Sequence, residues 1–237
     1  MNVTVLGSAR RRPVVRRRVA SVLAVATVVA GLVVSVQPAQ AASAGRRPDL
    51  DGDGKADLVA VTGRYLAVRL GTGQTRVIPT PWGRFDLCVV VAGDFDADGY
   101  DDVAVGDPHA DPAGGINFDH GVVWVFPGGP KGSAIGDGTK PTLTLAQGQN
   151  GLPGMTSDEW FGTSLAAGDV TGDGVDDLVV GAPFARYTDA AIGGSITVLP
   201  GSSGGLALSS AKVITQDTPG VSGTSDLDPR VTARPRL

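Results

Sequence analysis

The chain contains almost no glutamate: of its 24 acidic residues, 23 are aspartate and only Glu159 is glutamate. Aspartate favours turns and disfavours helix interiors, whereas glutamate is a good helix former. Glycine, the other residue common in turns, is abundant, with 35 among 237 residues. This composition excludes a helical bundle or coiled coil and predicts a turn-rich, all-β protein of one or two domains.

Cysteine and aromatic residues are also scarce. The single cysteine, Cys88, excludes an internal disulfide, and its apolar neighbours from 87 to 91 favour a buried small hydrophobe over a reactive thiol. Aromatic residues make up 5% of the chain, but the overall hydrophobic content of 42% is ordinary. Global disorder is therefore excluded.

The first 41 residues have the pattern of a secretory leader. A basic segment precedes an apolar run at 19–36, and Ala39-Gln40-Ala41 fits a small-residue cleavage site. We expect cleavage near Ala41, a secreted, extracellular product, and no stable membrane span afterwards. The alternative is an uncleaved anchor, because 18 apolar residues reach the lower limit for a span. The basic residues are Arg10, Arg11, Arg12, Arg16, Arg17 and Arg18.

Removal of this leader makes the remaining chain strongly acidic. Its 196 residues carry 14 basic and 24 acidic groups, a formal net charge of −10. Nucleic-acid binding requires a basic stripe, and none remains, so we expect no nucleic-acid partner. The acidic charge either keeps the exported domain soluble or marks cation sites.

Three nine-residue acidic loops share one pattern, with oxygen-bearing side chains at positions 1, 3, 5 and 9 and glycine at position 6. The first loop spans 49–57, the second 94–102 and the third 169–177. Positions 1, 3, 5, 7 and 9 are Asp49, Asp51, Asp53, Lys55 and Asp57; Asp94, Asp96, Asp98, Tyr100 and Asp102; and Asp169, Thr171, Asp173, Val175 and Asp177.

This spacing suits calcium, which takes six to eight oxygen ligands. Alternate side chains of a tightly wound loop converge on one point, and glycine at position 6 permits the required sharp turn. Position 7 is expected to offer its backbone carbonyl, which leaves its side chain unrestricted. We predict up to three Ca²⁺ sites, of which the third is weaker because Thr171 replaces an acid. The alternative is a set of solvated Asp/Gly turns.

The loops differ from EF-hand loops, which carry an acid at position 12 and lie between helices. Position 12 is Ala60, Val105 or Val180, and β-forming residues follow each loop at once. Apolar segments at 87–93 and 164–168 precede the second and third loops. Each loop is therefore expected to connect the strands of a β-hairpin.

The pattern extends into a longer repeat. Third strands are predicted at 65–71, 121–128 and 194–201, and weaker fourth strands at 142–145 and 212–215. Four short strands in each repeat indicate β-propeller blades.

The sequence resembles the FG-GAP repeat family, which builds the N-terminal β-propeller of integrin α subunits and occurs in many secreted bacterial proteins. The loops match the family pattern D-x-D-x-D-G-x-x-D. Phe161-Gly162 and Gly181-Ala182-Pro183 in the third unit match its other hallmarks. The second unit is looser, with 84–86 in place of Phe-Gly and 106–108 in place of Gly-Ala-Pro, and the first unit has neither hallmark.

The resemblance implies an incomplete propeller of about 2.5–3 blades, whereas a closed one needs about four to eight. We assign 42–80 to a partial first blade, 81–150 to the second, 151–220 to the third, and 221–237 to an irregular tail that could be a shortened next repeat. We expect either a truncated gene product, which is favoured, or an open array. An open array would pair with copies of itself through exposed blade edges.

The resemblance also implies a non-catalytic module for adhesion or ligand binding, with structural calcium and an extracellular protein or polysaccharide as ligand. Two alternatives remain. The chain is an accessory propeller of a secreted hydrolase or lyase, or it is an assembly piece that closes a ring only by oligomerising.

Few residues offer catalytic chemistry. The 201–205 segment fits G-x-S-x-G around Ser203, but a helix after it is implausible and a turn is expected. His109 and His120 are candidate transition-metal ligands, although a solvated loop is favoured; their acidic neighbours are Asp107, Asp111 and Asp119. Blade-core packing is favoured over a carbohydrate platform for Trp82, Trp124 and Trp160.

Overall fold

The computed structural model describes residues 47–62, 65–79, 88–112, 119–130, 135, 140–154, 159–188 and 191–222. The expected leader at 1–41, Trp82, the 84–86 segment and the tail from 223 onward lie outside these described residues. Within them the chain is all-β with very little helix, such as the three-residue 3₁₀ helix η2 (Leu208–Ser210). No helix in this part of the chain has the length and apolar character needed to cross a membrane.

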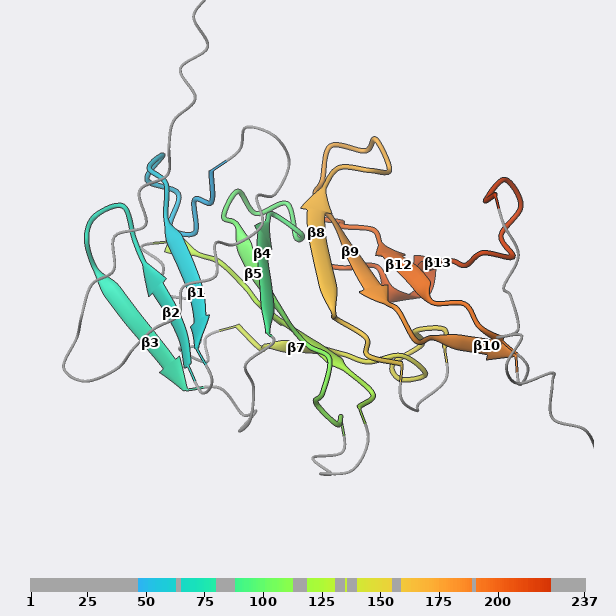
Figure 1. The fold of residues 1–237 in the computed structure, drawn as a ribbon. Coiled ribbons are helices and arrows are strands. Elements are labelled where there is room, and N and C mark those ends of the chain that lie inside the picture. The colour runs from blue at the N-terminus through green and yellow to red at the C-terminus, as the bar shows by residue number, and fades with distance from the viewer. Residues whose placement is uncertain are drawn as a thin grey trace, which may run out of the picture. The chain divides into compact units, whose positions relative to one another are not determined.

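Three antiparallel sheets contain most of the strands (Figure 1), and we call them blades 1, 2 and 3. Neighbouring strands in each are consecutive, apart from a small β10–β11 hairpin inserted in blade 3. Blade 1 holds β1 (Leu58–Thr62), β2 (Tyr65–Arg69) and β3 (Thr75–Pro79). Blade 2 holds β4 (Val89–Gly93), β5 (Asp102–Asp107), β6 (Val122–Phe126) and β7 (Leu143–Leu145). Blade 3 holds β8 (Ser164–Gly168), β9 (Asp177–Ala182), β12 (Ser195–Leu199) and β13 (Lys212–Ile214), and the hairpin holds β10 (Arg186–Thr188) and β11 (Ala191–Ile192).

Sheets of this kind confirm the expected propeller blades, and the described residues form no closed ring. The fourth strands expected in blades 2 and 3 are present as β7 and β13. Two elements were not expected from the sequence: β3, which completes blade 1 as a three-stranded sheet, and the β10–β11 hairpin.

Blade 2 is buried on both faces because it lies between two cores. Every residue of β5 and β6 is buried, and successive side chains of a strand point to opposite faces. In β5, Val103 and Val105 pack against blade 1, whereas Ala104 packs against blade 3. In β6, Trp124 packs against blade 1 and Val123 packs against blade 3.

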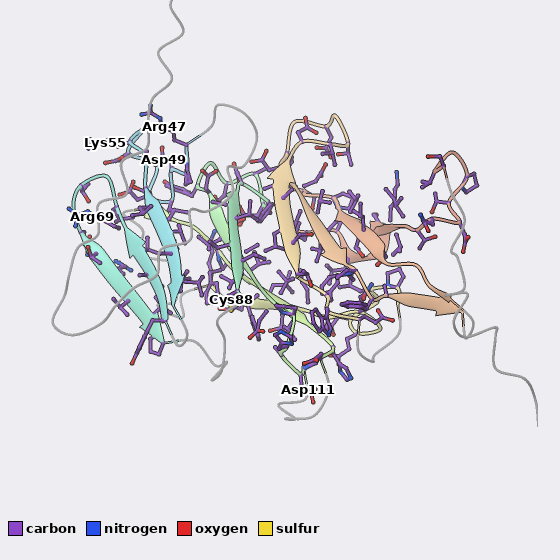
Figure 2. The ribbon with its side chains drawn as sticks, in the orientation of Figure 1. Arg47, Asp49, Lys55, Arg69, Cys88 and Asp111 are labelled. Atoms are coloured by element: carbon purple, nitrogen blue, oxygen red, sulfur yellow. The ribbon has the colours of Figure 1, made fainter. Side chains whose placement is uncertain are left out.

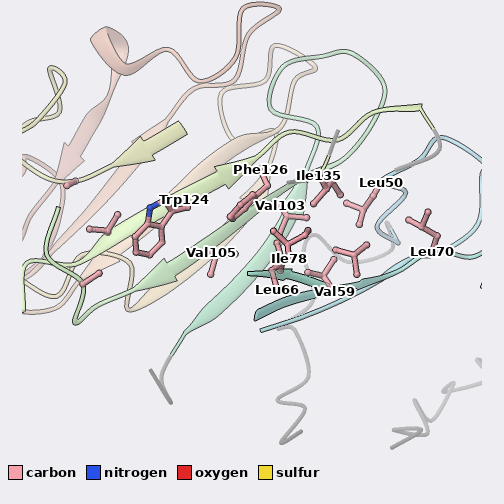
Figure 3. Packing of buried hydrophobic residues seen from close by; sticks show 14 residues of the cluster. Leu50, Val59, Leu66, Leu70, Ile78, Val103, Val105, Trp124, Phe126 and Ile135 are labelled. Carbon is pink, nitrogen blue, oxygen red and sulfur yellow. The ribbon is translucent and has the colours of Figure 1, made fainter. Parts of the chain in front are cut away.

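The core between blades 1 and 2 joins side chains from both sheets (Figure 3). Leu66 and Val68 of β2 are buried against Val103 and Val105 of β5, and Leu50 of the first acidic loop belongs to the same cluster. Burial at about 25 cal/mol per Å² of apolar surface makes such sheet-to-sheet contact the main stabilising term. Neither sheet has its own second layer, so each relies on its neighbour.

The Phe161–Gly162 segment forms part of the contact between blades 2 and 3. Phe161 is fully buried in the second core, and its N–H donates to the His120 carbonyl at 3.1 Å. Gly162 lies against the backbone of Gly106, where a Cβ would come 2.3 Å from the Gly162 carbonyl oxygen. This close approach between backbones requires glycine at 106.

We predict that Leu178→Ala destabilises the protein by about 2–5 kcal/mol, because it leaves a cavity in a fully buried position of the second core. Leu58→Ala is the matched control. It occupies the same place after its acidic loop but is 54% exposed, so a change below about 0.5 kcal/mol is expected. The measurement is the urea midpoint at a dilute protein concentration. Equal losses would contradict the assigned packing.

Candidate metal centres

The three acidic loops occupy equivalent places in the three blades. The second and third connect the first two strands of their sheets, since Gly93 pairs with Asp102 and Gly168 with Asp177. This confirms the expected hairpins for these two loops. The first loop leads directly into β1. All three lie at the same end of the sheets (Figure 1), because hydrogen bonds join each to the next.

Position 1 closes each loop by accepting backbone N–H groups. The Asp49 carboxylate accepts from Asp53 at 3.1 Å and from Gly54 at 2.9 Å. The equivalent bonds to Asp94 and Asp169 measure between 2.9 and 3.1 Å. The glycine at position 6 has a φ of 78°, 88° and 92° in the three loops, the left-handed region that favours glycine. The turn predicted at this position is therefore present.

Carboxylate oxygens converge in the first two loops. One oxygen each of Asp49, Asp51 and Asp57 lie within 4.8 Å of one another, and the same holds for Asp94, Asp96 and Asp98. Two oxygens bound to one calcium ion at about 2.4 Å can be at most about 4.8 Å apart. The donor sets therefore fit a hard divalent cation, and these clusters could hold a metal ion.

The third loop lacks such a cluster. Groups of three acidic or histidine ligand atoms occur only in the first two loops among the described residues. Thr171 occupies position 3, and its hydroxyl oxygen lies 3.4 Å from a carboxylate oxygen of Asp177. Asp169 and Asp173 remain as exposed acids of this loop.

The aspartate at position 9 is buried in every loop and ties two backbone segments together. Asp102 accepts the N–H of Phe95 at 3.0 Å and that of Gly128 at 2.8 Å. Asp57 makes the corresponding bonds to Leu50 and Gly71, and Asp177 to Val170 and Gly201. The start of each loop is thereby joined to the glycine turn that follows β2, β6 or β12 of the same blade.

Burial makes ionisation of these acids costly. It raises the pKa of Asp102 to about 7, against the lowering effect of the Gly128 hydrogen bond. Burial also raises the pKa of Asp57 and Asp94, and neighbouring loop carboxylates add to the effect. A bound cation would favour the ionised forms and so remove this cost.

Two lysines place positive charge on the loops. The Lys140 ammonium donates to Asp96 at 3.3 Å and also to Asp98, and it comes from the segment between β6 and β7. Lys55 donates to Asp53 at 2.8 Å, and this hydrogen bond lowers the pKa of Asp53. Both contacts show that the loop carboxylates attract cationic groups.

Position 8 has a role that the sequence analysis missed. In blade 2 the Asp101 carboxylate accepts the N–H of Asp49 at 2.8 Å, while the Asp101 N–H donates to the Asp49 carbonyl at 3.0 Å. Asp176 of blade 3 makes the same pair of bonds to Asp94 of blade 2, at 3.2 and 3.3 Å. We call this reciprocal pair the loop latch. The signal was available, because position 8 is aspartate in two loops and Ala56 in the first.

Further bonds accompany the loop latch. The N–H of Gly129 donates to the Leu50 carbonyl at 3.2 Å, and the N–H of Ser202 donates to the Phe95 carbonyl at 3.2 Å. The side chain at position 7 also takes part in the second loop. A Cβ at Gly52 would lie 2.6 Å from the Tyr100 ring, so Tyr100 covers the first loop and is not the unrestricted side chain that we expected.

Asp111 lies at the opposite end of the sheets (Figure 2), in the segment between β5 and β6 that also holds both histidines. His109 Nδ1 is 2.9 Å from an Asp119 oxygen, and His120 Nδ1 is 3.9 Å from an Asp111 oxygen. No group of three metal-ligating atoms that includes a histidine occurs among the described residues. The arrangement therefore does not support the transition-metal alternative.

The other catalytic and aromatic candidates have structural surroundings. Ser203 lies in a turn, with the Ser202 hydroxyl donating to the Gly205 carbonyl, and the turn is followed by the three-residue 3₁₀ helix η2 and not by the α-helix of a nucleophile elbow. Trp124 is buried in the first core, as expected. Cys88 packs beside the same core, and burial raises the pKa of its thiol to about 12, so it is a poor nucleophile.

Asp107 is fully buried beside this histidine segment. One of its oxygens accepts the His109 N–H at 3.0 Å, and the other has no hydrogen-bond partner in the described part of the chain. Burial raises the pKa of Asp107 from 3.8 to about 6. Because the folded-state pKa is the higher one, the stability contribution is complete below about pH 4 and is lost as the pH rises through about 6.

We predict that Asp107→Asn reduces the fall in unfolding free energy between about pH 4 and 7 by on the order of 3 kcal/mol and leaves the part that Asp102 contributes. The measurement is denaturant unfolding at a series of pH values. Ser209→Ala, a change at an exposed residue that does not titrate, is the control and should leave the profile unaltered. A wild-type slope retained in Asp107→Asn would exclude this group as the source.

Comparison with protein families adds to these observations. Residues 161–199 match the FG-GAP repeat, and residues 49–105 match the FG-GAP-like repeat. The first match runs from Phe161 through the third loop to the end of β12, and the second begins at Asp49 and contains the first two loops. The chain is an FG-GAP repeat protein.

Integrin α chains are among the relatives of this FG-GAP repeat protein. It is 30% identical over 154 residues to mouse integrin alpha-M, an alignment that covers 56% of this chain and 12% of the relative. It is 38% identical over 101 residues to Drosophila melanogaster integrin alpha-PS2, an alignment that covers 42% of this chain and 6% of the relative. It is 38% identical over 102 residues to Xenopus laevis integrin alpha-5, an alignment that covers 43% of this chain and 9% of the relative. The chain thus spans only a small part of the length of these relatives.

Proposed function

We propose that this protein is a secreted, calcium-binding FG-GAP repeat module that binds an extracellular ligand without catalysis. The observation that carries the proposal is the convergence of three carboxylates in each of the first two acidic loops. The integrin relatives support a role in ligand binding, and the match to the FG-GAP-like repeat contains the first two loops. The ligand class that we propose is an extracellular protein or a polysaccharide.

Calcium would act structurally. The loops lie where each blade meets the next, and their acids are buried enough to raise the pKa of Asp57, Asp94 and Asp102. A divalent cation would offset the repulsion among these carboxylates. It would also hold the start of each loop against the glycine turn to which the position-9 aspartate is bonded. The rigid loops would then present one face of the array to a partner.

We predict that calcium binds the first two loops with dissociation constants on the order of 10⁻⁴–10⁻³ M and raises the melting temperature. Calorimetric titration of the full chain measures the number of sites and their affinities. Asp96→Asn should remove one site, because it takes a carboxylate from the second cluster. Asp217→Asn is the matched control and should bind like the wild type.

The third loop supplies a gain-of-function arm of the same experiment. Thr171→Asp restores the carboxylate at position 3 and should add or tighten one site. The proposal fails if the wild-type chain shows neither binding heat nor a change in melting temperature on adding calcium or a chelator.

Secretion forms a separate part of the proposal, supported by the basic segment, the apolar run and the Ala-Gln-Ala site. We predict that the exported protein begins at Ala42. Mass spectrometry and N-terminal sequencing of protein from the culture medium measure this, and Ala41→Leu should impair processing. Full-length chain retained with the cell membrane would contradict it and favour the uncleaved anchor.

The absence of catalysis is proposed because the candidate groups serve other roles. Ser203 lies in a turn, and His109 lies beside the carboxylate of Asp119 and packs edge-on against Trp160 with a centroid distance of 4.8 Å. Binding to panels of immobilised extracellular proteins and polysaccharides, with and without chelator, tests the ligand assignment. Hydrolysis of generic ester or glycoside substrates that disappears in His120→Ala would contradict the non-catalytic assignment.

A further inference from the structure

Exposed apolar side chains collect on the two outer faces of the array. Eight large hydrophobic residues of the described chain are exposed, and six of them lie on these two faces. We call the side of blade 1 that points away from blade 2 the leading face, and the side of blade 3 that points away from blade 2 the trailing face. The leading face carries Leu58, Tyr65 and Val77, and the trailing face carries Val170, Ile196 and Ile214.

Strand alternation establishes these assignments. In β2 the buried Leu66 and Val68 belong to the core shared with blade 2, so Tyr65 points the other way. In β12 the buried Thr197 and Leu199 face blade 2, so Ile196 faces outward. Ile214 of β13 is paired with Ile196 and lies on the same face.

The trailing face has the same chemistry as an interface that is already formed inside the chain. Val170 occupies the loop position of Phe95, which is buried where blade 2 meets blade 3. Ile196 likewise occupies the place in β12 that the buried Val123 occupies in β6. Val170 is nevertheless 61% exposed and Ile196 47% exposed. The trailing face of blade 3 is therefore equivalent to the face of blade 2 that packs against blade 3.

The leading face is the matching half. Leu58 occupies the place of Val103, which is buried where blade 2 meets blade 1, and Tyr65 occupies the place of Val122. Leu58 is 54% exposed, and Val77 on β3 is 59% exposed. Each internal contact joins these two kinds of face, one from each sheet.

Charge is partly complementary at the loop ends of the two faces, although Lys55 is also paired with Asp53 and the exposed Lys212 lies on the trailing face. Arg47, Lys55 and Arg69 are exposed residues of blade 1 and its loop (Figure 2), whereas the third loop exposes Asp169 and Asp173. Inside the chain, the position-7 side chain Tyr100 lies over Gly52 of the preceding loop. In the same register, Lys55 of another copy would lie over the third loop, beside its acids.

We propose that a second copy of this chain docks head to tail, with the leading face of one copy on the trailing face of the other. The described residues of two copies would bring together six four- or three-stranded sheets, a number within the range of closed propellers. The contact is heterologous, since the two surfaces differ. This inference goes beyond the proposed ligand-binding function and does not depend on it.

One part of the internal contact is missing from this pairing. Position 8 of the first loop is Ala56, so a docked copy offers no carboxylate to the Asp169 N–H. The contact between copies is consequently weaker than the contact between blades, and it depends on concentration. Restoring the carboxylate with Ala56→Asp would complete the loop latch and tighten association.

Sedimentation of the full chain at concentrations from micromolar to several hundred micromolar tests the proposal. The wild type is expected to pass from monomer to dimer. Val77→Asp blocks the leading face and Ile196→Asp blocks the trailing face, so each variant alone should remain monomeric. An equimolar mixture should regain a dimer, because each variant retains the face that the other has lost. Val221→Asp, at an exposed residue outside the sheets, is the control and should associate like the wild type.

The overturning results are distinct. A wild-type chain that stays monomeric throughout excludes a second copy as the occupant. Val77→Asp that dimerises alone shows pairing between two trailing faces, which contradicts the head-to-tail arrangement. The Ala56→Asp variant should have a dissociation constant lower by on the order of tenfold, as expected for one added charge-assisted hydrogen bond. An unchanged constant would contradict the proposed register, and unaltered circular dichroism spectra establish that each variant is folded.

Discussion

The fold depends on the buried aspartate at the end of each acidic loop. Asp57, Asp102 and Asp177 each accept one N–H from the loop start and another from the glycine turn after β2, β6 or β12. In its ionised form such a carboxylate makes hydrogen bonds roughly twice as strong as those of a neutral acceptor. It fixes the hairpin end relative to this glycine turn, and this fixed end is what the next blade contacts.

The blades are consequently coupled through both their cores and their loops. Blade 2 contributes side chains to two cores and backbone groups to two loop latches. A disturbance in its strands therefore reaches both neighbours, as in repeat proteins whose stability is shared between adjacent units. The acidic loops combine this structural role with a surplus of carboxylate oxygens, and that surplus is what makes them suitable for a cation.

The sequence predicted the local features well. Glycine at position 6 and the β-forming residues after each loop establish the hairpins, because their effects act within a few residues. Asp101 and Asp176 were missed because their role depends on an N–H in a different blade, about 50 to 80 residues earlier. Strand β3 was missed because three of its five residues are exposed, only Ile78 is buried, and the strand is specified by pairing with β2. Apolar packing on both faces of blade 2 likewise becomes visible only when the neighbouring sheets are in place.

The direction of the loop latch has a consequence for how such a chain can change in length. In both instances the carboxylate comes from the later blade and the accepting carbonyl from the earlier one. Blade 2 carries both halves of the loop latch. Its Asp101 bonds to Asp49 of the earlier blade, and its Asp94 bonds to Asp176 of the later blade. An in-frame duplication of this unit would therefore lengthen the array by one sheet with no compensating substitution elsewhere. The middle repeat carries both groups that a neighbouring copy needs after gene duplication. The direction of its contacts preserves the order of the copies.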